Sequence, residues 1–154
     1  MKKRKPHFWL LVASFLFFLS LFFADSESTL DINIHDTYYV IAHGHLYGML
    51  AVVLFFLYTI YWSFDKGKIG LIQMLSKWHI YGTLLSLIGM FFPYHLIFPE
   101  SGFPPFDNKQ NINVCLTVCG LLFLFLQLLF IINIFVSIIK KLCKSATLQL
   151  KKNE

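Results

Sequence analysis

Two histidines, His43 and His45, lie near one end of a 28-residue segment that contains no Asp, Glu, Lys or Arg. Ionisable side chains inside a membrane are costly and are therefore candidates for function. On a regular helix, positions i and i+2 point about 200° apart, so the two imidazoles cannot chelate one ion together. Each can reach a different cofactor, and imidazole is a common axial ligand of haem iron. Hydrogen bonding to neighbouring helices is the alternative, and spacing alone leaves both interpretations open.

Three further histidines lie near the predicted membrane interfaces. His35 precedes Asp36 just outside the predicted second helix. Together these two side chains could hold a divalent cation, or they could cap the helix, with Asp36 and Thr37 in the N-terminal cap positions. His79 and His95 fall at opposite ends of the predicted third helix, where we expect hydrogen bonding at the interfaces.

Four charge-free segments must position these residues. They span 6–24, 37–64, 78–99 and 110–139, and only 14% of the 154 residues are charged. Each segment is long enough to cross a hydrocarbon core, which takes about 20 residues of helix. This pattern excludes a soluble globular protein, a disordered tail and a nucleic-acid binder. It predicts an all-α polytopic protein, a single membrane domain over residues 1–154 with four transmembrane helices at about 7–24, 37–63, 77–98 and 111–140.

The basic residues predict the orientation of these helices. Twelve of the 13 Lys and Arg fall before the first segment, between the second and third, or after the fourth. By the positive-inside rule, both termini are expected in the cytoplasm. Trp9, Trp62 and Trp78 lie at the predicted inner helix ends, as in an aromatic belt. The first segment also resembles a cleavable signal peptide, but we favour a retained anchor.

Small and helix-breaking residues give local expectations. Gly44 and Gly48 form a small-xxx-small pattern that lets another helix approach closely. Pro93 should kink or end the third helix near the outer face. Cys115 and Cys119 share one helical face, where we expect them to act as small packing residues rather than as ligands.

A longer string around the histidines resembles a known family. The run LDINIHDTYYVIAHGH at positions 30–45 resembles the most recognisable segment of subunit I of haem–copper cytochrome oxidases. KWH at 77–79 and FFPYH at 91–95 are similar to the next helix of that family, at matching spacing. The resemblance extends from about Phe8 to Lys141 and corresponds to the last four helices of the family's subunit I.

The resemblance implies roles by position. His43 matches the axial ligand of the high-spin haem, and His45 matches one axial ligand of the low-spin haem. His35 and Asp36 match ligands of a magnesium site near the outer surface, and Asp31 matches an acidic residue close to the haem propionates. The resemblance therefore implies haem as a cofactor and Mg²⁺ as a second candidate. The family's orientation places this motif on the outer side, in agreement with the charge pattern.

Several departures from the family limit the expected function. No residue of this chain corresponds to the copper-ligating histidines or to the second axial ligand of the low-spin haem. Pro104 and Pro105 replace an arginine pair that holds propionates, and Gly44 replaces the usual aromatic residue between the two histidines. We therefore expect no copper, and no oxygen reduction by this chain alone, which leaves its status as an enzyme open.

Taken together, these expectations describe a small haem-binding protein of the bacterial cytoplasmic membrane, linked to electron transport in aerobic respiration. A second copy of the chain or another respiratory membrane subunit would supply the missing iron ligands, and no nucleic acid is involved. The alternatives are a cofactor-free accessory or assembly protein of a respiratory complex, and one piece of a split oxidase.

Overall fold

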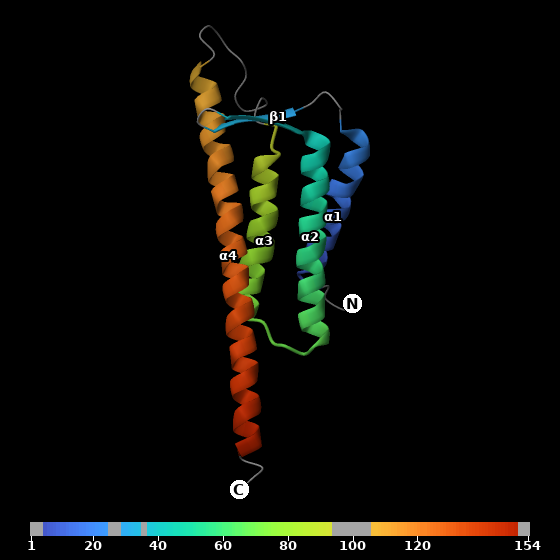
Figure 1. The fold of residues 1–154 in the computed structure, drawn as a ribbon, viewed down its shortest axis with the longest axis vertical. Helices are drawn as coiled ribbons and strands as arrows, with labels where there is room; N and C mark the ends of the chain where they lie inside the picture. Colours follow the sequence, from blue (N-terminus) through green and yellow to red (C-terminus); the bar gives the residue numbers. More distant parts are fainter. Residues whose placement is uncertain (1–4, 25–28, 35–36, 94–105, 151–154) are drawn as a thin grey trace. The chain divides into compact units, whose positions relative to one another are not determined.

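A computed structural model describes residues 5–24, 29–34, 37–93 and 106–150, without the side chains of 30–34, 38–39, 106–113 and 144–150. The elements, in chain order, are α1 (Phe8–Ser20), η1 (Leu21–Phe23), β1 (Thr29–Ile34), β2 (Thr37–Ala42), α2 (His43–Lys66), α3 (Gln73–Met90) and α4 (Phe106–Leu150). They divide into two compact units, Met1–Lys68 and Ile69–Glu154, and each unit is built on one pair of helices (Figure 1).

The first unit is held together by the contact between α1 and α2. Leu10 of α1 and Leu54 of α2 are fully buried, and the Ser14 hydroxyl donates a hydrogen bond of 2.8 Å to the carbonyl of Ala51. The close approach predicted at the two glycines is confirmed. A Cβ atom added at Gly48 would lie 3.6 Å from a methyl carbon of Leu21, in ordinary van der Waals contact.

The start of the second helix differs from the prediction. α2 begins at His43, and the residues from Thr37 to Ala42 form strand β2, which pairs antiparallel with β1 in a register that places Thr29 opposite Ala42. The predicted helix start at 37, with Thr37 as a cap, is therefore wrong, while the described residues are mostly helical, as predicted. Thr, Tyr, Val and Ile are enriched in strands because their side chains pack well on a pleated surface. This β propensity outweighed the capping signal.

In the second unit, α3 packs closely against α4 at two glycines of α3. A Cβ atom added at Gly82 would lie 2.8 Å from Leu126, and one added at Gly89 would lie 2.5 Å from Sγ of Cys119. At these distances a neighbour must move to admit a side chain, which the flexible end of Leu126 can do more easily than the short side chain of Cys119. The two glycines therefore permit the close packing of this pair, and Cys119 contributes to it as the small packing residue that its position on the helix predicts.

The bounds of α3 and α4 also differ from the predicted ones. α3 begins at Gln73 rather than 77, because the side-chain amide of Asn133, on α4, bonds to the residue just before α3. Oδ1 of Asn133 accepts from the N–H of Ile72 at 3.0 Å, and Nδ2 of Asn133 donates to the Ser76 hydroxyl at 3.0 Å. α3 ends at Met90 and not at the predicted 98, and the early end lies three residues before Pro93, the residue predicted to kink or end this helix. α4 runs beyond the predicted 111–140 at both ends.

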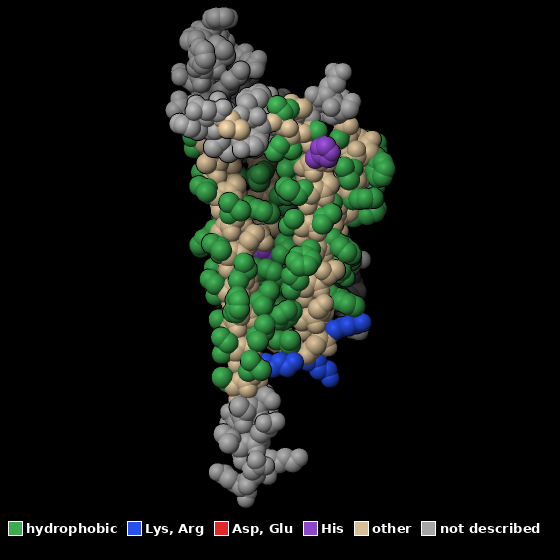
Figure 2. Space-filling view, in the orientation of Figure 1, with side chains coloured by type: hydrophobic (Ala, Val, Ile, Leu, Met, Phe, Trp, Pro, Cys, Tyr) green, Lys and Arg blue, Asp and Glu red, His purple; other side chains and the backbone are tan. Residues whose placement is uncertain are grey.

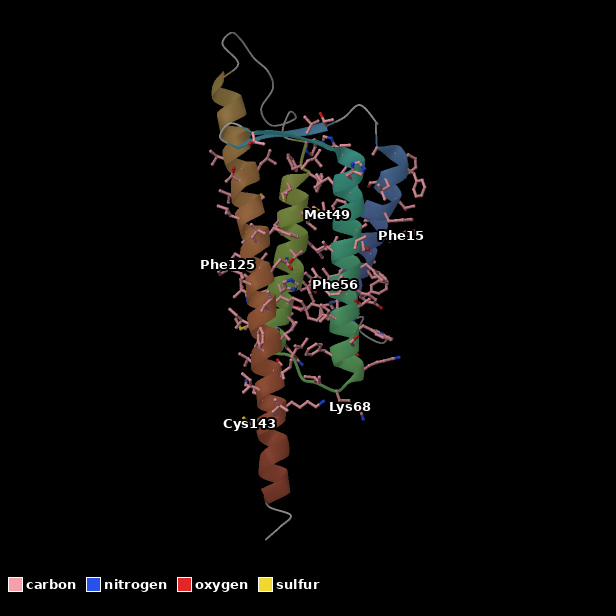
Figure 3. The ribbon with its side chains drawn as sticks, in the orientation of Figure 1. Phe15, Met49, Phe56, Lys68, Phe125 and Cys143 are labelled. Carbon is pink, nitrogen blue, oxygen red and sulfur yellow. The ribbon has the colours of Figure 1, made fainter. Side chains whose placement is uncertain are left out.

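The surfaces of the helices are apolar, as expected for a lipid environment (Figure 2). Phe15, Met49, Phe56 and Phe125 are each more than half exposed and project outward from their helices (Figure 3). Among the described residues, two helical segments are long and apolar enough to cross a membrane, His43–Lys66 and Val114–Cys143. The structure thus supports membrane character and helices in all four charge-free segments, while four crossings and cytoplasmic termini remain predictions.

The close contact at Gly89 gives a first testable prediction. Gly89→Ala should lower the free energy of unfolding by about 1–3 kcal/mol, because the new methyl group must displace Cys119 or separate the helices. Gly120→Ala is the matched control, since a Cβ atom there has no neighbour within 4 Å. The control should be neutral or stabilise by up to about 1 kcal/mol through helix propensity. Thermal unfolding in detergent measures both, and equal effects would contradict the packing described here.

The amide of Asn133 gives a second prediction. Asn133→Leu keeps the side-chain size but leaves the N–H of Ile72 without its partner, which should cost about 1–3 kcal/mol. Amide hydrogen exchange should accelerate at residues 73–76, where α3 begins. Ile132→Leu is the control, because Ile132 is half exposed and a surface change of this kind stays within about 0.5 kcal/mol. Unchanged exchange at 73–76 would show that Asn133 does not set the start of α3.

Candidate cofactor site

The two histidines of the motif lie in the first turn of α2. Ala42 precedes this turn in an extended conformation and no side chain caps it. Gly44, between the histidines, faces α1, and a Cβ atom there would lie 3.9 Å from Cβ of Ala24. Since His43 and His45 are each about 100° away from Gly44 around the helix, they leave α2 on the two sides of the α1 contact. One ion cannot be bound by both, in agreement with the sequence analysis.

The imidazole of His43 is partly enclosed. Its ring centroid lies 6.1 Å from that of Tyr47, one turn further along α2, at an interplanar angle of 57°. Its Nδ1 atom is buried and has no hydrogen-bond partner among the residues that the structure describes. A buried polar atom without a partner costs about 1–3 kcal/mol. A buried Nδ1 leaves no room for iron, so His43 would ligate haem through its other ring nitrogen, Nε2, and imidazole is a common axial ligand of haem iron. His43 therefore fits the cofactor that the resemblance implies by its residue type and its position in the motif.

The imidazole of His45 is in a different environment. It is exposed on α2, on the opposite side from His43. Polar side chains on membrane helices face other protein segments, water-filled spaces or a cofactor rather than lipid. His45 is therefore free to ligate a group that approaches from outside the first unit, and it supplies one ligand only.

The remaining predicted site residues are described incompletely. Asp31 pairs with Val40 in the β1–β2 ladder, but its side chain lies outside the described residues. His35 and Asp36 fall entirely outside them. Within the described part of the chain, no three His, Cys, Asp or Glu side chains gather as a metal site. The magnesium site therefore remains a prediction.

A buried polar cluster in the second unit was not predicted. His79 of α3 is fully buried, its Nε2 lies 3.2 Å from Oε1 of Gln127, and its ring stacks on Phe130 with centroids 4.6 Å apart. Nε2 of Gln127 donates to the hydroxyl of Thr83 at 3.4 Å. The hydrogen bond expected of His79 is present, but it lies between α3 and α4, and the depth of His79 relative to a membrane interface stays a prediction. The available signal was Gln127, one of the few polar residues, with Asn133 and Ser137, in the apolar part of α4.

Comparisons with known proteins give matches to one kind of protein. The chain is 28% identical over 117 residues, 68% of its length, to an alternative cytochrome c oxidase subunit 1 of Bradyrhizobium diazoefficiens. It is 34% identical over 74 residues, 47% of its length, to cytochrome c oxidase subunit 1 of Debaryomyces hansenii. It is 34% identical over 93 residues, 58% of the chain, to the same subunit of Albinaria turrita.

These matches cover only part of the relatives. The aligned region is 20%, 14% and 48% of their respective lengths, so the chain spans less than half of each curated relative. Neither a family model nor a solved structure matches the chain. The similarities support a subunit I-like relation over part of the chain, and with the apolar helices they indicate a membrane protein related to respiration.

Proposed function

We propose that this chain is a haem-binding membrane protein of aerobic electron transfer, in which His43 and His45 each ligate one iron. The observation that carries this proposal is the placement of His43 and His45 in the first turn of α2, where they leave the helix on opposite sides. Both residues lie in the string that resembles the haem-ligating segment of oxidase subunit I. Ionisable side chains on membrane helices are costly unless a partner or ligand satisfies them, and imidazole is a common axial ligand of haem iron.

The geometry of α2 supports two separate cofactors rather than one. The histidines flank the α1 contact and point about 200° apart, so each haem would occupy its own side of the helix. Haem, when bound, supplies reversible one-electron chemistry. The residues of this chain hold and orient it. His43 and Tyr47 form one wall, and the exposed His45 binds from the opposite side.

The second axial ligand of the low-spin haem would come from outside the motif. A second copy of the chain, or another respiratory membrane subunit, would provide this ligand from the side of α2 on which His45 is exposed. The bacterial cytoplasmic membrane is the proposed location, with the motif on its outer side. Oxygen reduction is not included in the proposal, because the residues that carry the resemblance correspond to haem ligands and not to copper ligands.

The reduced-minus-oxidised absorbance spectrum of protein purified from haem-replete membranes tests this proposal. The wild type should show haem absorbance. His43→Ala and His45→Ala should each lower retention of the haem that the replaced residue ligates about tenfold or more, so that each variant loses about half of the total haem, since even outer-sphere changes cost about 10–100-fold. His7→Ala is the matched control, because His7 precedes α1 at the other end of the first unit. It should leave the spectrum unchanged.

The same preparation distinguishes the alternatives. A wild-type protein without haem absorbance would contradict the proposal and favour a cofactor-free accessory or assembly protein. Oxygen consumption that appears only when a second subunit is co-expressed would favour one piece of a split oxidase. Loss of haem in the His7 control as well would indicate general unfolding rather than ligation.

A further inference from the structure

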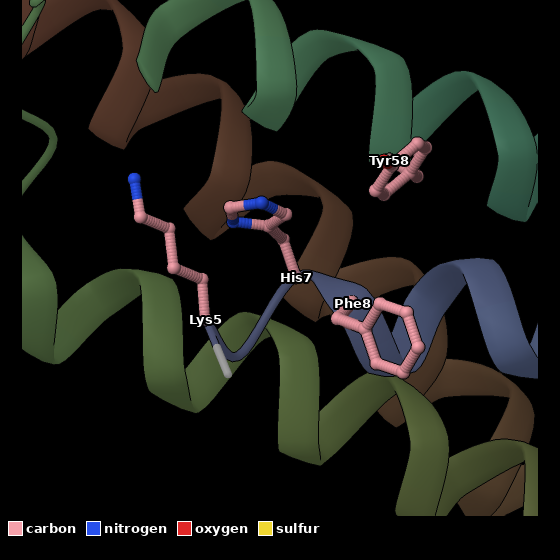
Figure 4. A pocket seen from close by; sticks show the side chains of 4 residues that line it. All are labelled: Lys5, His7, Phe8 and Tyr58. Atoms are coloured by element: carbon pink, nitrogen blue, oxygen red, sulfur yellow. The ribbon is translucent and has the colours of Figure 1, made fainter. Parts of the chain in front are cut away.

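A pocket lies at the opposite end of the first unit from the two motif histidines. It has a volume of about 350 Å³ and is lined by Lys5, His7, Phe8 and Tyr58 (Figure 4). The first three residues come from the start of α1, and Tyr58 comes from α2. The His7 ring is held against α2, with its centroid 6.3 Å from Tyr61 at an interplanar angle of 7° and 5.9 Å from Tyr58. The volume falls in the range of small-molecule pockets, about 300–1,000 Å³.

The surroundings of the pocket are those of a membrane–water interface. Trp9 follows the pocket residue Phe8 and is 48% exposed, and Trp62 of α2 is 43% exposed. Exposed tryptophans of membrane proteins collect at the level of the lipid headgroups. Nζ of Lys66 lies 4.1 Å above the Trp62 ring, as expected where a cation and an aromatic ring share this region. The pocket therefore opens at headgroup depth.

The charge around the pocket favours an anion. Lys5, Lys66 and Lys68 are all exposed at this end of the unit, against one carboxylate, Asp65. Lys5 forms an ion pair with Asp65, and the two side chains are 58% and 45% exposed. Exposed ion pairs contribute only about 0–1 kcal/mol. An incoming phosphate can therefore share or replace Asp65 as the partner of Lys5 at little cost.

We propose that this pocket binds the phosphodiester headgroup of an anionic phospholipid. The Lys5 ammonium supplies the positive charge, and the His7 imidazole and Tyr58 hydroxyl supply hydrogen-bond donors. The Phe8 and Tyr58 rings cover the glycerol and the upper acyl carbons. A soluble phosphate would leave these two rings uncovered, so the mixed lining favours a lipid. Basic pockets at the cytoplasmic ends of membrane helices are a known location for anionic headgroups, and the charge pattern predicts that this end is cytoplasmic.

Native mass spectrometry of the purified protein tests the proposal, with dioleoylphosphatidylglycerol as the probe and dioleoylphosphatidylcholine as the neutral comparison. The wild type should retain phosphatidylglycerol in preference to phosphatidylcholine. Lys5→Met keeps the length of the aliphatic stem but removes the charge, and it should weaken retention about fivefold. Lys68→Met is the control, because Lys68 is exposed at the same end but does not line the pocket. Its charge lies outside the pocket lining and acts only through the screened surface field, so its loss should weaken retention clearly less than Lys5→Met does.

Asp65→Asn distinguishes binding from folding, because it removes the competing carboxylate and should strengthen retention of phosphatidylglycerol. Loss of structure cannot produce a gain, so this variant keeps the test decisive even if Lys5→Met folds poorly. Equal retention of the two lipids, or an unchanged affinity in Lys5→Met, would overturn the proposal. Displacement of the lipid by millimolar inorganic phosphate would also overturn it and would indicate a site for small anions.

Discussion

A polar side chain inside an apolar helix must find its partner within the protein, since lipid offers none. In both helix pairs of this protein, some of these partners lie on the neighbouring helix. In the first unit, the Ser14 hydroxyl bonds to the backbone of α2 at Ala51. In the second, Asn133 bonds to Ile72 and Ser76, and Gln127 bonds to His79. These bonds fix which faces meet, while the glycines decide how closely they meet.

Two buried side-chain atoms of the described residues lack a hydrogen-bond partner, Nδ1 of His43 and Oγ of Ser137. The buried imidazole of His79, by contrast, bonds to Gln127. Of the two unpartnered side chains, only the imidazole is a common ligand of haem iron, which makes His43 the candidate ligand. The partial similarity to cytochrome c oxidase subunit 1 supports a subunit I-like relation, and the role of these two histidines, His43 and His45, as ligands is the proposal made above.

The position of His43 also depends on the hairpin before it. β1 and β2 occupy the residues that would otherwise form about one and a half further turns of helix, so α2 starts at His43 itself. The ligand pair consequently lies in the first turn, next to the end of α1, where Gly44 and Ala24 approach each other. At the other end of the unit, the start of α1 and the aromatic residues of α2 form a pocket of a different, basic character.

Much of the architecture follows from the sequence alone. Charge-free segments predicted helices in the four places where the structure has them, because hydropathy and length are local properties of the chain. The close approach at Gly48 and the end of α3 before Pro93 were predictable for the same reason. The motif string also identified His43 and His45 as the candidate ligands, and the i, i+2 spacing excluded a shared ion.

Other features depended on the tertiary structure. The start of α3 and the burial of His79 are set by side chains of α4 that lie 61 and 48 positions further along the chain. The strand at 37–42 forms because a second strand pairs with it, although its residues also fit a capped helix. The sequence by itself therefore determined that the chain is apolar, helical and supplied with two separate imidazoles. Only the tertiary structure decided which polar groups are partnered, because hydrogen bonding is a property of pairs of segments and not of either segment alone.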